Sequence, residues 1–364
     1  LEFRRVLFRS RHRSPAVASR RSAVQGDSPG RFMKRRDFVA GLPLAALGLS
    51  GLWPSAGHAN TTDFATWLEA LRREARQKGL SQRTIDDALS NVAPIARVLE
   101  LDRRQPETTL TFDQYIGRVV NDARADTARQ RIVENRELLL QVSNRFNVQP
   151  RFIVALWAIE TDFGRITGGF PVIEALATLA YDGRRSAFFR EELLNALRII
   201  ERTGVRARDM KGSWAGAMGQ SQFMPSSYLA YATDFDGDGK ADIWNSRADV
   251  FASIANYLSK VGWRASETWG RQVRLPAGFD PALIDDRQLK KGSKTLVEWQ
   301  ALGVRKSDGS ALPQREVSGW IVQPGGSDGP AFLVYPNYRA LLNWNRSLFF
   351  ATAVGYLADR IGEG

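Results

Sequence analysis

Glu160 is the residue of this sequence whose type and position best suit acid–base chemistry. Pro150 is typical of the first turn of a helix. Three apolar residues at helical spacing follow it: Ile153, Leu156 and Trp157. By the i, i+3, i+4, i+7 rule, the next position of that apolar stripe is Glu160. Burial of a carboxyl group favours its protonated form, which a general acid needs, so the segment predicts a general acid on a helix.

The residues that follow Glu160 leave a second interpretation open. Asp162 is expected to leave the helix in another direction, and Gly164 is typical of a helix end. The helix should therefore stop close to a loop that a substrate can reach. The structural alternative is that Glu160 pairs with a buried arginine or caps a neighbouring helix, because structural ion pairs also perturb carboxylates. Periodicity alone does not decide between the two.

Residues 212–227 form a second candidate site, rich in glycine and in small polar side chains. The glycines permit unusual backbone angles and the close approach of a ligand. Neutral hydrogen-bonding side chains come from Ser213, Gln220, Ser221 and Gln222. Such groups beside aromatic residues suit a sugar better than a phosphate, and the Gly-Lys-Ser/Thr ending of a phosphate loop is missing. The alternative is a tight linker between two helices, with a serine capping the second helix.

Acidic residues in the segment 234–245 follow the spacing of a helix–loop–helix calcium-binding loop. The expected ligands are carboxylates of Asp234, Asp236, Asp238 and Asp242 and the backbone carbonyl of Lys240. Position 12 of the loop is Asn245 in place of the usual bidentate glutamate, and Asp249 is a carboxylate that can replace it. A metal-free turn is the alternative, although carboxylates this close repel one another without a cation. The sequence therefore predicts a structural Ca²⁺.

The absence of cysteine and the position of the two histidines exclude several classes of site. His12 and His58 both lie in the N-terminal stretch, so residues 60–364 contain neither histidine nor cysteine. Thiol nucleophiles, disulfides, Ser-His-Asp constellations and zinc or haem sites built on imidazole or thiolate are excluded there. The chemistry must rest on carboxylates, hydroxyls, amides, cationic side chains or an oxygen-ligated metal. No cofactor is expected to be required for it.

The formal charge of +12 is concentrated at the N-terminus. Residues 1–59 hold 11 of the 51 Lys and Arg residues and 3 of the 39 Asp and Glu residues. The rest of the chain therefore has 40 basic and 36 acidic residues. A surface so close to balance gives no reason to expect recognition of a phosphate backbone, and no nucleic-acid partner is predicted.

The N-terminal residues are expected to direct export. Residues 1–32 are an arginine-rich segment that we expect to be a non-native or upstream lead, and residues 33–59 resemble a signal peptide. Arg35 and Arg36 precede an apolar run, as in a twin-arginine signal, and small residues suit cleavage before Asn60. An ordinary secretory signal is the alternative. Both predict a periplasmic protein, and no other stretch is long and apolar enough to span a membrane.

The remaining chain is predicted to be mainly helical with a small β-rich part, an α+β class. Helical spacing begins at Asp63, β-like segments between Gly, Pro and Asp clusters begin near Gly270, and helical spacing returns at the C-terminus. The expected units are a helical domain (60–145), a catalytic core with the calcium loop (146–269), a small β segment (270–336) and a C-terminal helix packed on the helical part (337–364).

Several long segments can be compared with known families. Residues 155–164 read Ala-Leu-Trp-Ala-Ile-Glu-Thr-Asp-Phe-Gly, and the glycine-rich segment follows them. Further segments are 101–107, Arg184-Arg185 with Phe188-Phe189, the calcium loop and 343–347. In their order along the chain, these segments resemble the membrane-bound lytic transglycosylase B family, from about Asp63 to Gly364. Several motifs in order are far more specific than any one of them.

The resemblance implies a lysozyme-like helical core flanked by a helical domain and a small β domain. It also implies cleavage, without water, of the β-1,4 bond between N-acetylmuramic acid and N-acetylglucosamine in peptidoglycan, leaving a 1,6-anhydromuramoyl end. Glu160 matches the family's single catalytic acid/base. Implied substrate contacts are Ser213 and Gln222 for the sugar and its N-acetyl group, Tyr257 and Asn345 in the groove, and Arg184 and Arg185 for the stem peptide.

The same resemblance implies glycan strands as the partner, a monomer, and cell-wall synthesis complexes as further candidate partners. This chain departs from the family in two ways. It has no cysteine for a lipid anchor, so a soluble, non-lipidated member is expected, and Phe350 stands where some members have tyrosine.

Two alternative functions remain. One is a hydrolysing muramidase on the same fold, which prefers a second carboxylate, and the other is a non-catalytic peptidoglycan-binding scaffold.

Overall fold

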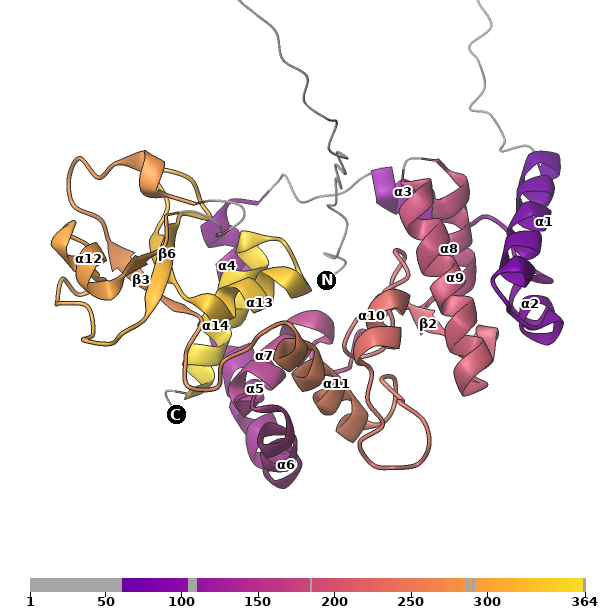
Figure 1. The fold of residues 1–364 in the computed structure, drawn as a ribbon, viewed down its shortest axis with the longest axis horizontal. Helices are drawn as coiled ribbons and strands as arrows, with labels where there is room; N and C mark the ends of the chain where they lie inside the picture. Colours follow the sequence, from indigo (N-terminus) through magenta and orange to yellow (C-terminus); the bar gives the residue numbers. More distant parts are fainter. Residues whose placement is uncertain (1–60, 104–109, 184, 286–288, 290–291, 363–364) are drawn as a thin grey trace, which may run out of the picture.

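The structure is a computed structural model that describes residues 61–103, 110–183, 185–285, 289 and 292–362 (Figure 1). The expected lead and signal peptide, residues 1–59, lie outside the described residues, and so does Arg184. Among the described residues, no helix has both the length and the apolar character that crossing a membrane requires.

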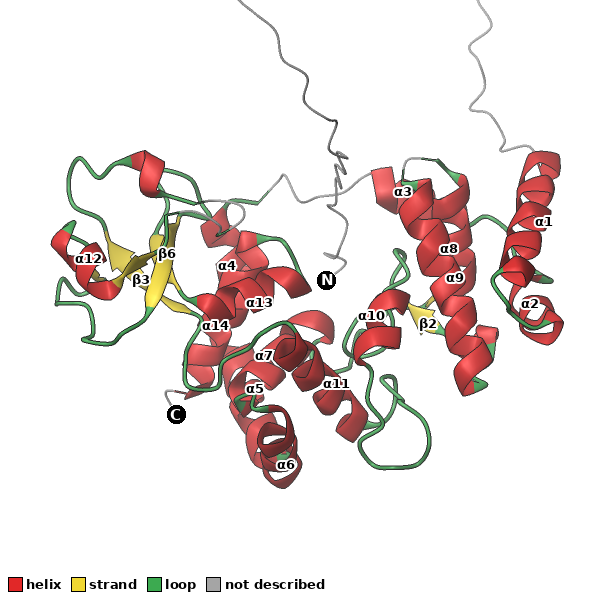
Figure 2. Cartoon of the chain, in the orientation of Figure 1, coloured by secondary structure: helices red, strands yellow, loops and turns green. Residues whose placement is uncertain are grey.

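Helices dominate the described chain, and its strands are short (Figure 2). The helices are α1 (Thr61–Gln77), α2 (Gln82–Leu89), α3 (Ala96–Arg103), α4 (Phe112–Val119), α5 (Asp122–Glu134), α6 (Arg136–Phe146), α7 (Pro150–Thr161), α8 (Val172–Tyr181), α9 (Ser186–Thr203), α10 (Pro225–Tyr231), α11 (Arg247–Lys260), α12 (Leu296–Ala301), α13 (Pro336–Trp344) and α14 (Leu348–Gly362). The strands are β1 (Phe170–Pro171), β2 (Lys211–Gly212), β3 (Gly270–Arg274), β4 (Lys294–Thr295), β5 (Arg305–Lys306), β6 (Ser318–Val322) and β7 (Ala331–Val334). The predicted mainly helical α+β class is confirmed.

α7 forms the centre of the helical core. Pro150 is its first residue, as predicted, and every residue from Phe152 to Thr161 is buried. The helix packs against α5 and α6, which precede it directly in the chain, and against α11 and α14, which come much later. A helix that is apolar on all sides is typical of a core position. α7 is therefore more completely buried than the single apolar stripe predicts.

The helices of the expected N-terminal domain pack in two places. α2 packs against α9, and α3 packs against α8. Ser81 Oγ, just before α2, donates a hydrogen bond of 2.8 Å to Glu201 of α9. α4, α5 and α6 pack instead with α14, α7 and α11. In Figure 1, α1 and α2 lie at one end of the molecule, whereas α5 and α6 lie beside α7. The domain boundaries expected at residues 146, 270 and 337 stay predictions.

The small sheet has the strand order β4-β6-β7-β3-β5, and each neighbouring pair is antiparallel. Successive residues of a strand point to opposite faces. Ile321 and Leu333 belong to a small core around Trp299 of α12, whereas Trp320 and Phe332 belong to the main core of the helices. Because both faces are buried, the sheet is fixed against the helical part.

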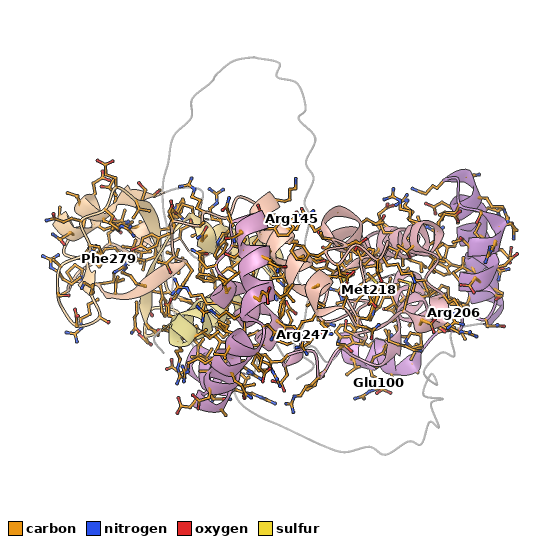
Figure 3. The ribbon with its side chains drawn as sticks, turned by 90° about the horizontal axis from the view of Figure 1, so that it is seen from below. Glu100, Arg145, Arg206, Met218, Arg247 and Phe279 are labelled. Carbon is orange, nitrogen blue, oxygen red and sulfur yellow. The ribbon has the colours of Figure 1, made fainter. Side chains whose placement is uncertain are left out.

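The chain returns from the sheet to the helical core through α13 and α14. Pro336 begins α13 close behind β7, and α14 packs on α7. Gly355 of α14 has no space for a side chain, since a Cβ atom would lie 2.2 Å from the ring of Trp269. Seen from below, Phe279 of the sheet region lies near one end of the molecule and Arg206 lies toward the other (Figure 3). The C-terminal residues thus complete the core around α7.

Candidate active site

Glu160 lies in the last turn of α7, just before the backbone changes direction. The helix ends at Thr161, and Asp162, Phe163 and Gly164 follow with φ angles of 51°, 60° and 81°. Positive φ is costly for residues that carry a side chain and is common at functional sites. The sequence predicts the helix end at Gly164, whereas the left-handed turn already begins at Asp162. Glu160 is therefore held between a rigid helix and a tight turn.

The Glu160 carboxyl group is buried and contacts a tryptophan from a distant part of the chain. Glu160 is 6% exposed, and Trp344 Nε1 donates a hydrogen bond of 2.5 Å to its Oε1. Trp344 is the last residue of α13. A directional N–H donor fixes the orientation of the carboxyl group. The carboxyl group is thus positioned by α13 as well as by α7.

Trp344 is packed among aromatic rings from two further elements. Its ring centroid lies 4.7 Å from that of Tyr257 in α11 and 5.3 Å from that of Phe223 in the glycine-rich segment. The Tyr257 hydroxyl donates a hydrogen bond of 2.7 Å to the backbone carbonyl of Asn343. These contacts bring α7, α11, α13 and the glycine-rich segment together around Glu160. Tyr257, which the resemblance singled out, belongs to this cluster.

Sequence reasoning missed Trp344, although it singled out its neighbour Asn345. The signal that could have found Trp344 is its place three residues after Leu341, on the apolar side of a helix. A tryptophan buried there needs an acceptor for its N–H group. Asn345 itself follows α13, and its Oδ1 accepts a hydrogen bond of 3.1 Å from the backbone N–H of Ser347.

Two predicted sugar-binding side chains of the glycine-rich segment form hydrogen bonds to backbone groups. Ser213 Oγ accepts a hydrogen bond of 3.0 Å from a backbone N–H of the same segment. Gln222 has a φ of 51°, and its Nε2 donates to the carbonyls of Thr167 and Gly219 at 2.9 Å each. Phe223 then joins this segment to Trp344. Ser213 and Gln222 thus shape the loop that reaches the Glu160 cluster.

Arg185 lies immediately before α9 and contacts α3. Its guanidinium group forms an ion pair with Asp102, which is 2% exposed, and lies 5.1 Å from the ring centroid of Phe189. These contacts hold Arg185 against α3 and α9. Its neighbour Arg184 lies outside the described residues.

Asp162 is the carboxylate closest to Glu160 in the sequence, and it is paired with arginines. Its side chain is buried, Arg124 of α5 lies 3.7 Å from Oδ1, and Arg165 pairs with Oδ2. Removing one partner of a buried ion pair leaves an uncompensated charge, so these pairs matter for the fold. Asp162 therefore suits a structural role at the turn better than the role of a second catalytic carboxylate.

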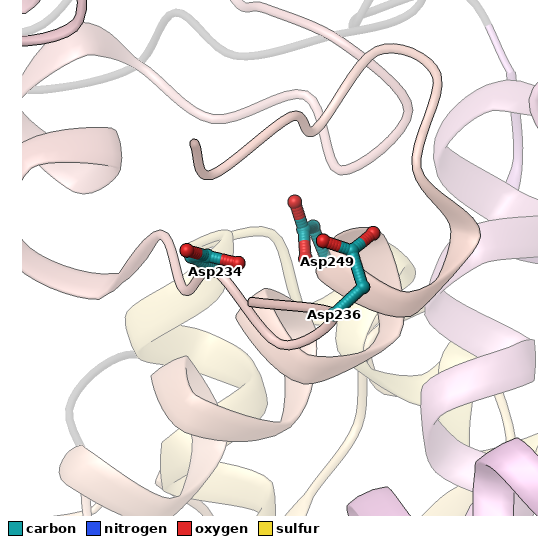
Figure 4. Close-up of side chains that lie close together, drawn as sticks. All are labelled: Asp234, Asp236 and Asp249. Atoms are coloured by element: carbon teal, nitrogen blue, oxygen red, sulfur yellow. The ribbon is translucent and has the colours of Figure 1, made fainter. Parts of the chain in front are cut away.

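Asp234, Asp236 and Asp249 gather in the acidic loop, residues 234–245 with Asp249 of α11 (Figure 4). Each offers one carboxylate oxygen, and these atoms lie within 4.8 Å of one another. Asp249 is fully buried, and burial raises the pKa of its carboxyl group even though backbone N–H groups of Phe235 and Asp242 donate to it. Carboxylate oxygens are the ligands that Ca²⁺ prefers, so the donor set fits this ion.

The other expected calcium ligands make different contacts. Asp238 is exposed, and its Oδ1 accepts a hydrogen bond of 2.9 Å from the backbone N–H of Lys240. Asp242 Oδ1 accepts hydrogen bonds of 2.9 Å from the backbone N–H groups of Trp244 and Asn245. Asp249 thus joins Asp234 and Asp236, while Asp238 and Asp242 shape the backbone of the loop.

Comparison with known sequences identifies a family and a curated relative. A family model described as the transglycosylase SLT domain matches residues 63–359. Membrane-bound lytic murein transglycosylase B of Escherichia coli (strain K12) is 32% identical over 222 residues, which are 59% of this chain and 58% of that protein. The matched part of this chain therefore spans little more than half the length of that curated relative.

Solved structures share the fold. The crystal structure of SltB3 from Pseudomonas aeruginosa in complex with NAG-anhNAM-pentapeptide is 43% identical, with a TM-score of 0.78, and the match covers 83% of this chain and 80% of that one. Escherichia coli SLT35 in complex with calcium is 25% identical, with a TM-score of 0.69 and coverage of 84% and 94%. The resemblance found in the sequence is confirmed, and the chain belongs to the transglycosylase SLT domain family.

Proposed function

We propose that this protein is a lytic transglycosylase that cleaves the β-1,4 bond between N-acetylmuramic acid and N-acetylglucosamine in peptidoglycan, forming a 1,6-anhydromuramoyl product. The observation that carries the proposal is the buried Glu160, oriented by Trp344 at the end of the central helix. The relatives support it, since SltB3 structures hold NAG-anhNAM-pentapeptide in one case and NAG-NAM-pentapeptide in another.

Glu160 acts in both steps of the proposed reaction. It first gives its proton to the glycosidic oxygen as the bond from that oxygen to the anomeric carbon of the muramoyl residue breaks. As a carboxylate, it then takes the proton of the muramoyl 6-hydroxyl while the oxygen of that group bonds to the anomeric carbon. The substrate supplies the nucleophile, so no water enters the product. Ordinary glycosidases need two carboxylates, whereas here Asp162 is occupied by Arg124 and Arg165.

Trp344 supports this chemistry by holding one oxygen of Glu160. Its N–H group donates to Oε1 in either protonation state, so the carboxyl group keeps one orientation while it loses and regains a proton. The aromatic rings around Trp344 keep that N–H group in place. A side chain that must both donate and accept within one catalytic cycle gains from such fixed positioning.

Replacing Trp344 with phenylalanine is expected to lower kcat by about 10- to 100-fold, because a hydrogen bond to a charged group contributes about 1.5–3 kcal/mol. The ring remains, so the packing against Tyr257 and Phe223 should change little. The measurement is the initial rate of muropeptide release at saturating sacculi, together with the melting temperature. An unchanged kcat in a folded variant would show that this hydrogen bond is not used in catalysis.

The substrate contacts belong to the same proposal. Ser213 and Gln222 would meet the sugar and its N-acetyl group, and Tyr257 and Asn345 would line the groove. Arg184 and Arg185 would meet the stem peptide. The support is that Tyr257 and Phe223, the neighbour of Gln222, contact Trp344, which donates to Glu160. Asn345 directly follows Trp344. Arg185 would have to meet the peptide with its ion pair to Asp102 in place.

We also propose a structural Ca²⁺ in the acidic loop. Asp234, Asp236 and Asp249 would hold it, and rearrangement of the loop on binding would bring in Asp238, Asp242 or the Lys240 carbonyl. The ion would neutralise three neighbouring carboxylates and so fix the connection between α10 and α11. The calcium complex of Escherichia coli SLT35 supports this assignment. No reaction step depends on the ion.

The site of action follows from the substrate. Peptidoglycan glycan strands are the proposed partner, so the protein would act in the periplasm after export by the twin-arginine-like or an ordinary secretory signal. We propose a monomer, with recruitment by cell-wall synthesis complexes as a further candidate. The named Escherichia coli relative is described as membrane-bound.

Product analysis tests the proposed reaction. Purified sacculi are digested with the protein, and the soluble muropeptides are identified by mass spectrometry. A lytic transglycosylase releases 1,6-anhydromuropeptides, which are lighter by one water than their hydrolysed counterparts. Release of muropeptides with free reducing ends would instead show a hydrolase. Binding to sacculi without release would show a scaffold.

A further inference from the structure

Gln220 makes hydrogen bonds with every polar group that it has, and they reach two different parts of the molecule. Its Oε1 accepts from Trp157 Nε1 at 2.8 Å, and its backbone carbonyl accepts from Thr161 Oγ1 at 2.9 Å. Its Nε2 donates to the carbonyl of Trp244 at 2.7 Å, and its backbone N–H donates to the carbonyl of Ile243 at 2.8 Å. The residue therefore lies between α7 and the end of the acidic loop.

The two partners of Gln220 on α7 flank Glu160. Trp157 is three residues before Glu160, and Thr161 is the next residue after it. Thr161 Oγ1 also accepts a hydrogen bond of 3.1 Å from the backbone N–H of Gly164. Gln220 thus contacts the helix turn that carries the carboxyl group and, through Thr161, the positive-φ turn that follows it. Any shift of this turn would move Glu160.

The close approach of Gln220 explains the glycine at position 164. A Cβ atom there would lie 2.3 Å from Gln220 Oε1, and the φ of 81° is one that side chains rarely adopt. The backbone of the turn therefore lies directly against the Gln220 amide. The Trp157 ring is fixed from the other sides, at centroid distances of 5.5 Å to Phe163 and 5.1 Å to Phe251.

On its other side, Gln220 is anchored to backbone that the acidic loop holds in place. The N–H group of Trp244 donates to Asp242 Oδ1 at 2.9 Å, and the N–H group of Asp242 donates to the buried Asp249 at 2.7 Å. The carbonyl groups that Gln220 contacts are therefore not those of a loose loop. Gln220 has fixed partners on both sides.

We propose that Gln220 is a positioning residue, which holds the last turn of α7 against the end of the acidic loop and thereby sets the position of Glu160. It does not contact the substrate in this role. The proposal rests on the proposed function for its catalytic consequence, but its structural part stands without it. A displacement of about 1 Å in a catalytic group can lower a rate about 100-fold, so the expected effect is on kcat.

The first test replaces Gln220 with methionine, which keeps the length of the side chain but has no amide. We expect kcat to fall by about 10- to 100-fold with KM unchanged, measured well below the melting temperature. The matched control is Gln300→Met, because Gln300 also bonds a backbone group, the N–H of Leu312 at 2.7 Å, but lies in α12. This control should lower stability without lowering kcat.

Two outcomes of this test would overturn the proposal. A kcat of Gln220→Met equal to that of the wild type, or lowered no more than that of Gln300→Met, would leave only a structural role. A rise in KM with unchanged kcat would indicate a substrate contact instead.

A double-mutant cycle of Gln220→Met with Trp157→Phe tests whether Gln220 acts through its hydrogen bond with Trp157. If the hydrogen bond between Trp157 and Gln220 carries the effect, the double variant loses about as much kcat as the larger single loss. If the fold-losses in kcat of the two single variants multiply in the double variant, the hydrogen bond with Trp157 does not carry the effect.

Hydrogen exchange provides a readout that does not depend on activity. In Gln220→Met, amides of a peptide covering 157–166 should exchange faster than in the wild type, while the same peptide in Gln300→Met should not change. If the wild type releases nothing from sacculi, the proposed function fails, and the exchange experiment still decides the positioning role. Equal protection of 157–166 in the wild type and both variants would overturn it.

Discussion

Replacing Glu160 with glutamine is expected to abolish the release of anhydromuropeptides while leaving the fold intact. General acid–base catalysis by one side chain contributes typically about 10²- to 10⁴-fold, and more is expected here because the same residue acts in both steps. Glutamine has the size of glutamate, and its side-chain oxygen can still accept from Trp344. It can neither give nor take the catalytic proton. The loss should therefore appear in kcat, without a cavity in the core.

The stability of the Glu160→Gln variant distinguishes a catalytic from a structural carboxylate. Glu160 is 6% exposed, and an amide is less costly to bury than a charge, so the melting temperature should stay the same or rise. A structural ion pair would give the opposite result, since removing one partner of a buried pair is strongly destabilising. Rate and melting temperature must therefore be measured on the same preparation.

Asp162→Asn is the matched control for the loss of a carboxylate. Asp162 is buried close to Glu160, but it contacts Arg124 and Arg165. We expect a lower melting temperature and a rate within about tenfold of the wild type. Near wild-type release by Glu160→Gln at equal protein concentration would end its assignment. A much larger loss in Asp162→Asn than in Glu160→Gln would point to Asp162 instead.

Much of this arrangement could be predicted because it depends on local patterns. Pro150 and the apolar spacing after it predict α7 and the burial of Glu160, and both are confirmed. The β-like segments correspond to β3, β6 and β7. The family could be named from the sequence, because the motifs and their order along the chain can be read without knowing the tertiary contacts. The catalytic role of Glu160 stays a prediction that the Glu160→Gln experiment tests.

What could not be predicted depends on contacts between distant parts of the chain. Trp344 reaches Glu160 only because α13 returns from the sheet to the end of α7. Gln220 was one polar residue among several in a glycine-rich segment, and nothing local shows that it bonds both Trp157 and Trp244. Periodicity also shows which face of a helix is apolar, but not that α7 is enclosed on all sides.

In the acidic loop, the tertiary structure decides which of the predicted ligands lie together. The helix–loop–helix pattern treats Asp249 as a substitute for the missing glutamate at position 12. In the structure it lies with Asp234 and Asp236, and it is held by backbone N–H groups of the loop. Its position depends on α11, whose first turn begins after Ser246, and not on the spacing within the loop.

Calcium is expected to raise the melting temperature of the metal-free protein. A ligand that binds only the folded state stabilises it by RT ln(1 + [L]/Kd), about 2.7 kcal/mol at a hundredfold excess over Kd. Differential scanning fluorimetry with calcium and with a chelator measures the shift, and calorimetry measures the binding. Asp234→Asn should remove most of the shift. Asp280→Asn is the matched control. Asp234 accepts a hydrogen bond of 2.7 Å from the backbone N–H of Gly237, and Asp280 likewise accepts one of 2.9 Å from the backbone N–H of Ala282, but Asp280 lies in the sheet region.

The calcium effect should also depend on pH in a direction that the burial of Asp249 sets. Burial raises the pKa of Asp249 above its ordinary value of 3.8, so without a cation its protonated form stabilises the fold at low pH, and this contribution is lost as the pH rises through the raised pKa. Calcium binds the ionised form of Asp249 and therefore offsets this loss of stability at higher pH. The calcium-induced shift should therefore be larger near about pH 7 than near about pH 4. Equal melting temperatures with millimolar calcium and with chelator at both pH values, without binding heat, would show that the acidic loop is a turn and not a metal site.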